Sequence, residues 1–347
     1  DWYGEDSNVW RHDDRNTDRY ELAREAIQLA DDDIDFSQFD KDGDGLVDHV
    51  IVVHAGPAQE RAGGLPDEIW SHRWEIPGGE RVDGVRVVGY TAQSESSPLG
   101  IFVHEFGHDI GLPDLYDTDM VQEFVGNWDL MDHGSWNNDG NTPAQMCAWD
   151  RIKLGWLQPY IVERDENVTL PLHEIEQDWG TRAVKVTLDK NIYYLIEARQ
   201  QINYDSALPD HGVLITYCDD LRGSGQGPVR VRDAHPNVTA DWVLDDAAFD
   251  TDIKLGENSL YEDFKNGVTV TVSSAEADGY FWVNIVSGHP VPTFAGDISR
   301  ISPSSFTGDQ WTTVTVRIWN LGVEGGLVVN CENIPSGWSV QDMEGAD

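Results

Sequence analysis

Residues 104–114 read HEFGHDIGLPD, and this stretch decides the fold. Two histidines four residues apart lie on one face of a helix, so the imidazoles of His104 and His108 can reach the same metal ion. Glu105 lies beside them, where its carboxylate can accept a proton from a water at that ion. Hydrolytic zinc sites use three protein ligands and keep one position open for water. The pattern therefore predicts a catalytic zinc site with Glu105 as general base, and two structural histidines on a helix are the alternative interpretation.

The third zinc ligand is expected just after this helix. Gly111 follows His108 by three residues, where a left-handed residue can end the helix and turn the chain. Asp114 follows His108 by six residues, which completes the spacing HExxHxxGxxD. We expect Asp114 to be the third ligand. Asp117 is a rival in the same loop, and Glu123 is the nearest candidate for a ligand from a separate helix.

Residues 128–136 read WDLMDHGSW and place Met131 in a turn-like segment. A lone methionine is usually a core residue. After the zinc pattern, however, a thioether beneath the metal fits the Met-turn of one class of zinc peptidases. No tyrosine follows Met131 closely, so the residue that stabilises the oxyanion is unassigned. His133 is a candidate for this role.

Residues 40–48 read DKDGDGLVD and resemble a calcium loop. Carboxylates at positions 1, 3, 5 and 9, with glycine at position 6, match a loop of the EF-hand type. The bidentate glutamate of position 12 is missing, and Asp35 just upstream is a candidate to replace it. We expect a structural calcium site whose ligands are Asp40, Asp42, Asp44 and Asp48. A solvated acidic turn is the alternative.

The periodicity predicts a mixed first half and a β-rich second half. Helices are expected at 17–32 and 99–110, and at 142–154 after a capping box with Pro143. Strands are expected at 49–54 and 85–91, the latter as either a substrate-pairing edge strand or a core strand. Beyond Pro159, short strands are expected at 183–188, 193–198, 213–217, 268–272 and 280–286, then a linker at 287–296 and strands at 312–319 and 327–330. These divisions predict a catalytic domain at 1–160, an antiparallel β domain at 161–288, and a small or truncated immunoglobulin-like module at 291–347.

The charge of the chain is extreme: 23 Lys and Arg stand against 63 Asp and Glu among 347 residues, a net charge of -40. Fourteen Trp and 39% hydrophobic residues exclude a disordered acidic tail. The charge disfavours nucleic-acid binding, and no apolar run is long enough to span a membrane. We expect adaptation to high salt, with a secreted protein holding several calcium ions as the alternative. Of three Cys, Cys218 and Cys331 are candidates for a disulfide that the sequence does not establish.

The motifs together closely resemble those of the immune inhibitor A-like (M6) secreted metalloproteases. The resemblance extends from HEFGHDIGLPDLYDT and WDLMDHGSW to PAQMCAWDRIKLGWLQP. Upstream it includes FDKDGDGLVDHVIVVHAG and IWSHRW, and downstream YYLIEARQQINYDSALPDHGVLITY. It covers roughly residues 35–220.

This resemblance implies an α/β (α+β) zincin or metzincin-like catalytic domain followed by antiparallel β-sandwich domains. It implies a secreted, extracellular zinc endopeptidase that acts on proteins, is made with a removable pro-segment, and is stabilised by calcium. His104, His108 and Asp114 would bind zinc, Glu105 would be the general base, and Met131 the Met-turn residue. We expect a monomer. The alternative is a non-catalytic, calcium-stabilised surface or binding protein built on a protease-like fold.

Overall fold

The structure is a computed structural model that describes residues 20–61, 68–235, 244–251, 258–275, 280–288, 294–302 and 313–320. The chain divides into two compact units. The first comprises residues 1–261 and 269–287, and the second residues 262–268 and 288–347. The fold is a mixture of sheets with few helices, as the sequence predicts. Among the described residues, no helix has the length and hydropathy needed to cross a bilayer.

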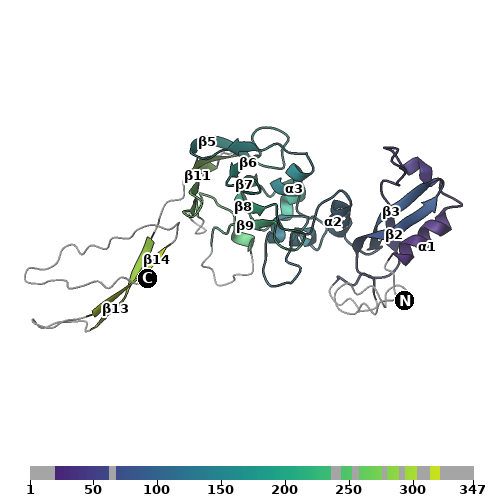
Figure 1. Ribbon diagram of the computed structural model, residues 1–347, viewed down its shortest axis with the longest axis horizontal. Coiled ribbons are helices and arrows are strands. Elements are labelled where there is room, and N and C mark those ends of the chain that lie inside the picture. Colours follow the sequence, from purple (N-terminus) through teal and green to yellow (C-terminus); the bar gives the residue numbers. More distant parts are fainter. Residues whose placement is uncertain are drawn as a thin grey trace, which may run out of the picture. The chain divides into compact units, whose positions relative to one another are not determined.

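The first unit begins with a three-stranded sheet that is covered by one helix (Figure 1). The helix is α1 (Glu21–Ala30), and the strands are β1 (Ile51–His54), β2 (His72–Val82) and β3 (Val85–Ser94). Ala23 and Ile27 of α1 share a core with Ile76, Val87 and Tyr90 of the sheet. The strand order is β1-β3-β2, with β1 parallel and β2 antiparallel to β3. The edge-strand interpretation of residues 85–91 is therefore wrong, because β2, which the sequence analysis missed, pairs with the second side of β3.

Helix α2 (Leu99–Asp109) confirms the helix predicted at 99–110. It contacts β3 on one side and the 3-10 helix η3 (His133–Trp136) on the other. The contact with η3 requires Gly100, since a Cβ atom there would lie 1.8 Å from the carbonyl oxygen of Ser135. The helix ends before Gly111, whose φ of 105° is in the region that favours glycine. The chain thus turns just where the third metal ligand is needed.

The helix predicted at 142–154 is much shorter: α3 spans only Ala148–Lys153. The residues before it are held extended because buried carboxylates accept their backbone N–H groups. Asp205 accepts from Gln145 at 2.7 Å and Asp129 from Cys147 at 2.7 Å, while Glu197 accepts from Ala148, the first residue of α3, at 2.5 Å. These acceptors come from outside the segment, so the local capping signal at Thr142 does not start a helix.

Between residues 160 and 287, the described part of the β-rich half forms two sheets. A five-stranded sheet has the order β4-β6-β7-β8-β9, and a four-stranded sheet the order β10-β11-β12-β5. The five-stranded sheet is antiparallel except where β4 and β6 run parallel. The bounds of these strands are Tyr160–Val162 (β4), Glu166–His173 (β5), Ala183–Thr187 (β6), Ile192–Arg199 (β7), Gly212–Asp219 (β8), Val229–Val231 (β9), Leu260–Asp263 (β10), Val268–Ala275 (β11) and Tyr280–Ser287 (β12).

One hydrophobic core joins the segment after α2 to the five-stranded sheet. Leu115 and Met131 are fully buried in the same cluster as Leu195 of β7 and Leu214 of β8. The chain that follows the HExxH helix therefore packs on strands that are about 60 to 100 residues further along the sequence.

The second unit contains the hairpin of β13 (Phe294–Ser302) and β14 (Thr313–Asn320), which pair antiparallel. Strand β14 confirms the strand predicted at 312–319. The strand predicted at 327–330 lies outside the described residues, as does Cys331. The immunoglobulin-like module at 291–347 stays a prediction.

Candidate metal centre

Helix α2 presents His104 and His108 side by side, with ring centroids 4.7 Å apart. Each ring is oriented through Nδ1 by a backbone carbonyl. His104 Nδ1 donates to the oxygen of Leu130 at 2.9 Å, and His108 Nδ1 to the oxygen of Leu112 at 2.9 Å. A histidine that binds a metal typically donates its other N–H in this way. Both Nε2 atoms are thus left with a lone pair for a metal.

The carboxylate of Asp114 lies close to both Nε2 atoms. Its Oδ1 lies 3.0 Å from Nε2 of His108 and 3.5 Å from Nε2 of His104. Its Oδ2 accepts a hydrogen bond of 3.1 Å from the Ser224 hydroxyl, whose oxygen accepts one of 3.0 Å from the backbone N–H of Asp114. The neighbouring Gly225 donates its N–H to the Asp114 carbonyl at 3.0 Å. The loop between β8 and β9 therefore fixes the orientation of this carboxylate.

The donor set fits a divalent metal. The ligand atoms of the three residues lie within 4.8 Å of one another, and Asp114 Oδ1 is buried without a hydrogen-bond donor in the described part of the chain. Burial lowers the pKa of His104, but Asp114 and Glu105 outweigh it and raise this pKa to about 9. Burial also raises the pKa of Asp114, yet the two histidines hold it below its usual range. A site that favours positive charge so strongly favours a cation.

Glu105 follows His104 on the same helix and is only 7% exposed. Burial raises the pKa of its carboxyl, although His104 and His108 lower it. A raised pKa brings a carboxylate closer to the range useful for a general base near neutral pH. Its position and environment suit proton transfer beside the metal.

Met131 lies beneath the two histidines. A Cβ atom on Gly107 would lie 2.5 Å from the Met131 sulfur, so the thioether packs directly on the helix between His104 and His108. Met131 is fully buried, and its carbonyl accepts the N–H of Leu115 at 2.9 Å. The segment of Met131 thus supports both the helix and the loop that holds Asp114.

The rival ligands lie elsewhere. Glu123 accepts the backbone N–H of Leu244 at 3.0 Å and lies 3.5 Å from His133 Nδ1. Asp117 is buried, and its carboxylate accepts three backbone N–H groups of the turn that follows it. His133 itself pairs with Glu123 and Asp132. The structure brings Asp114, and neither rival, to the two histidines.

Two residues near the metal ligands were missed by the sequence analysis. Tyr116 stacks on His104 with ring centroids 6.4 Å apart, and burial together with Asp114 and Glu105 raises the pKa of its hydroxyl. The sequence could have indicated Tyr116, because it lies two residues after Asp114. Ser224 had no such signal, because it is 110 residues from Asp114 in the sequence.

The predicted calcium ligands are only partly brought together. Carboxylate oxygens of Asp40, Asp42 and Asp48 lie within 4.8 Å of one another, whereas Asp44 is not part of this group. Asp44 instead accepts the N–H of Leu46 at 2.7 Å. Asp35 caps the 3-10 helix η1 (Phe36–Phe39), where it accepts the backbone N–H of Ser37 at 3.1 Å.

Comparison with known proteins identifies the same region. Residues 2–158 match the family model described as "Immune inhibitor A peptidase M6, catalytic domain". The chain is 35% identical over 163 residues to "Immune inhibitor A" of Bacillus thuringiensis subsp. alesti, in an alignment that covers 38% of this chain and 24% of that protein. It is 34% identical over 155 residues to "Pre-pro-metalloprotease PrtV" of two strains of Vibrio cholerae serotype O1, covering 37% of this chain and 17% of those proteins.

The alignments span a quarter or less of the length of these relatives. The match to the family model includes the part of the chain that contains HExxHxxGxxD and the Met131 segment. The resemblance of this part of the chain to the immune inhibitor A-like M6 metalloproteases is therefore confirmed.

Proposed function

We propose that the chain is a secreted, zinc-dependent endopeptidase that hydrolyses peptide bonds in protein substrates. The observation that supports this most strongly is the convergence of His104, His108 and Asp114 on one point beside the buried Glu105. The M6 family match supports the same reaction class. The alignments cover a quarter or less of the length of these relatives, so activity and substrates of the whole chain are part of the proposal.

In the proposed mechanism, His104, His108 and Asp114 hold zinc. Bound zinc supplies Lewis acidity, which lowers the pKa of water and polarises a scissile carbonyl. Glu105 accepts the proton of the attacking water and delivers it to the leaving amine. Leu130 and Leu112 hold the two imidazoles through their carbonyls, and Ser224 holds Asp114. Met131 keeps the underside of the site apolar.

We further assign a structural calcium site to the acidic loop, in which Asp40, Asp42 and Asp48 are the ligands that the geometry favours and Asp44 and Asp35 are supporting residues. Calcium there would connect η1 to the start of the sheet and stabilise the fold by mass action. The Vibrio relatives are named as a pre-pro-metalloprotease, which supports a removable pro-segment for this chain as well. The proposal also includes a secreted, monomeric protein. Its peptidase domain would be followed by an antiparallel β domain at 161–288 and an immunoglobulin-like module at 291–347.

Metal removal tests this function. Treatment with a zinc chelator at constant calcium and salt should abolish cleavage of an unfolded protein substrate, and added zinc should restore it. The intact fold of the zinc-free protein should be checked by circular dichroism. A folded, zinc-loaded protein that cleaves no unfolded substrate would instead favour the non-catalytic binding protein.

A further inference from the structure

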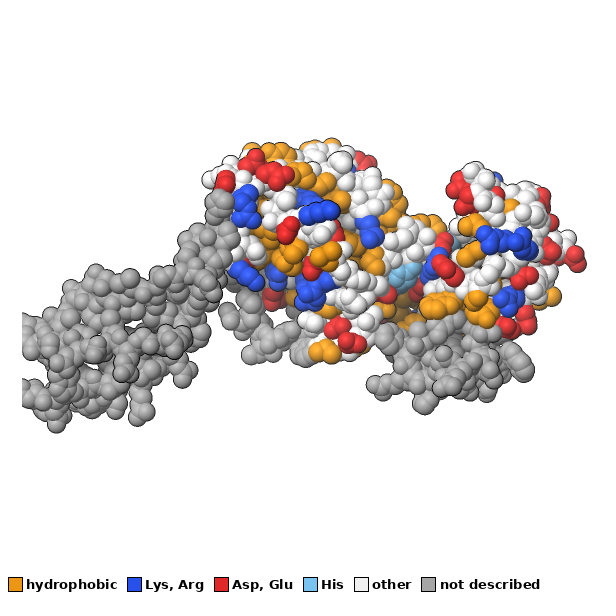
Figure 2. Space-filling view, in the orientation of Figure 1, with side chains coloured by type: hydrophobic (Ala, Val, Ile, Leu, Met, Phe, Trp, Pro, Cys, Tyr) orange, Lys and Arg blue, Asp and Glu red, His pale blue; other side chains and the backbone are white. Residues whose placement is uncertain are grey.

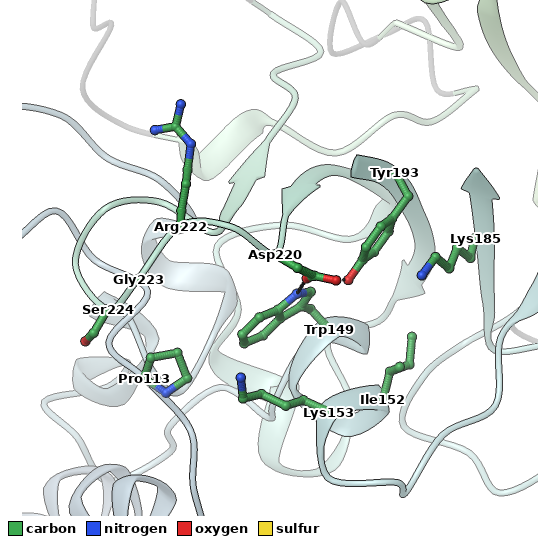
Figure 3. A pocket seen from close by; sticks show the side chains of 10 residues that line it. All are labelled: Pro113, Trp149, Ile152, Lys153, Lys185, Tyr193, Asp220, Arg222, Gly223 and Ser224. Carbon is green, nitrogen blue, oxygen red and sulfur yellow. Dashed lines mark hydrogen bonds between the residues drawn. The ribbon is translucent and has the colours of Figure 1, made fainter. Parts of the chain in front are cut away.

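A cavity of about 370 Å³ is lined in part by Pro113 and Ser224, which lie next to Asp114 of the proposed metal centre. Figure 3 shows the side chains that line it. Its wall is formed by the loop after α2, by α3, by β6 and β7, and by the loop after β8. The lining residues are Pro113, Trp149, Ile152, Lys153, Lys185, Tyr193, Asp220, Arg222, Gly223 and Ser224. All belong to the first unit.

Lysine is rare in this chain, and two of its six lysines line this cavity. The Lys153 ammonium lies 4.7 Å from the centre of the Trp149 ring, and the Lys185 ammonium lies 3.6 Å from that of Tyr193. Within the part of the chain that the structure describes, neither lysine forms a salt bridge. Aromatic faces hold the two ammonium groups in place without neutralising them.

Asp220 is the one acidic residue of the lining, and its carboxylate is already engaged. Its Oδ1 accepts hydrogen bonds from Trp149 Nε1 at 3.0 Å and from the Tyr193 hydroxyl at 2.8 Å. Arg222 extends away from the cavity (Figure 3) and pairs with Asp219 at 3.1 Å. Two lysines against one aspartate leave the cavity with an excess positive charge, in a protein whose net charge is -40.

Basic side chains continue beyond the cavity lining. Burial lowers the pKa of Arg230, and the charges of Arg222 and Arg232 lower it further, whereas Asp117 and Asp219 raise it. In Figure 2, Lys and Arg side chains gather on the visible face over α3 and β6 to β9. A local positive field in an otherwise negative protein attracts anions to this region and repels them elsewhere.

The cavity shares a wall with the metal centre. Pro113 precedes Asp114 in the chain, and Ser224 both lines the cavity and donates its hydroxyl hydrogen to Asp114 Oδ2. The shared wall puts this cavity next to the site at which the proposed endopeptidase would bind a peptide. The apolar walls of Trp149 and Ile152 suit the methylene groups of a peptide side chain.

We propose that this cavity is a substrate subsite for a carboxylate, which Lys153 and Lys185 bind by charge-assisted hydrogen bonds. The subsite selects an acidic side chain a few residues from the scissile bond. This inference rests on the proposed endopeptidase function and adds a substrate preference to it.

The test uses quenched fluorescent peptides of one sequence, with blocked termini and with Glu or Gln at each position in turn around a single scissile bond. A further peptide has Gln throughout and a free C-terminal carboxylate, which separates a side-chain carboxylate from a terminal one. Values of kcat/KM are measured at constant salt for the native chain and for Lys153→Gln and Lys185→Gln. Lys190→Gln is the matched control, because it removes the same charge from an exposed lysine outside the cavity.

The native chain should cleave the Glu peptide about ten times faster than the Gln peptide at one position. Each cavity variant should lose most of this preference, and Lys190→Gln should keep it. The proposal is overturned if no position shows a Glu preference, if only the terminal carboxylate is preferred, or if Lys190→Gln reduces the preference as much as the cavity variants do.

A binding measurement separates this proposal from the catalytic one. If the native chain cleaves no peptide, the endopeptidase proposal fails, and the cavity is then tested by calorimetric titration with the same Glu and Gln peptides. Stronger binding of the Glu peptide that is lost in Lys153→Gln and Lys185→Gln would still support a carboxylate site. Equal binding of the two peptides would refute it.

Discussion

At the scale of single residues, the proposed metal centre depends on contacts that orient its ligands. Carbonyl oxygens of Leu130 and Leu112 fix the two imidazoles, and Ser224 fixes Asp114 by two hydrogen bonds. Such outer contacts raise metal affinity because they select the binding orientation before the metal arrives. The spacing HExxHxxGxxD was sufficient to predict that His104, His108 and Asp114 come together, since they are local in sequence. Ser224 was not predictable, because nothing local relates it to Asp114.

Replacement of Ser224 by alanine should lower zinc affinity by about 10- to 100-fold, because Asp114 loses the hydroxyl that orients it. The melting temperature of the zinc-free protein should change little, since Ser224 is exposed. Zinc dissociation constants from competition with a chromophoric chelator provide the measurement. Ser273→Ala is the control, as it removes one hydrogen bond from an exposed serine of β11. Equal zinc affinity in the Ser224 and Ser273 variants would contradict the positioning role.

At the scale of elements, local signals predicted α2 well and α3 poorly. Helix α2 has its apolar positions, its histidine spacing and the terminating Gly111 within one stretch. The segment before α3 has a capping box, but Asp129 and Asp205 accept its backbone N–H groups and keep it extended. Tertiary acceptors outweigh a capping signal of about 1 kcal/mol. Strand β2 was missed because its residues include a proline and two glycines.

A buried ionic cluster connects α3 and the Met131 segment to the β-rich half. Arg199 of β7 is fully buried and pairs with Asp205 at 2.9 Å, Glu197 at 3.1 Å and Glu176 at 3.6 Å. It also donates to the carbonyl of Trp128 at 2.8 Å. One guanidinium group facing three carboxylates favours protonation of one of them. Burial and the hydrogen bond with Asp205 raise the pKa of Glu176 to about 8, although Arg199 lowers it.

This cluster predicts a pH dependence of stability. The folded state keeps the Glu176 proton to about pH 8, whereas the unfolded chain releases it near its ordinary pKa of 4.5. The folded state therefore binds the proton more strongly, and the free energy of unfolding should fall as the pH rises from about 4.5 to about 8. In Glu176→Gln this decrease should be smaller. Urea unfolding between pH 5 and pH 8.5 measures it, with Glu163→Gln on the surface as control. An identical slope in Glu176→Gln and the native chain would contradict the assignment.

At the scale of the whole molecule, the net charge of -40 opposes compaction, because like charges repel one another. The sequence predicted the mixed fold, the β-rich second half and the M6 resemblance. It did not predict that Ser224 in the β-rich half contacts Asp114, or that Arg199 of β7 contacts Trp128 in the Met131 segment. Both contacts join segments that are distant in the sequence. The loop between β8 and β9 that holds Asp114 also forms part of the wall of the positively charged cavity.

The excess charge predicts a strong salt dependence. Salt screens repulsion between surface carboxylates, so the melting temperature should rise by on the order of 10 °C between 0.1 and 2 M KCl at constant calcium. Scanning calorimetry measures this, and sucrose of matched osmolality is the control for exclusion effects. A melting temperature that is the same in low and high KCl would argue against adaptation to high salt.

The central claim is that Glu105 transfers the proton at a zinc ion held by His104, His108 and Asp114. The most direct test compares the native chain with Glu105→Ala for cleavage of an unfolded protein and for zinc content, in the same calcium and high-salt buffer. We predict about one zinc ion bound in both proteins, with cleavage at least roughly 1,000-fold slower in Glu105→Ala. Equal cleavage by the two zinc-loaded proteins would contradict the claim.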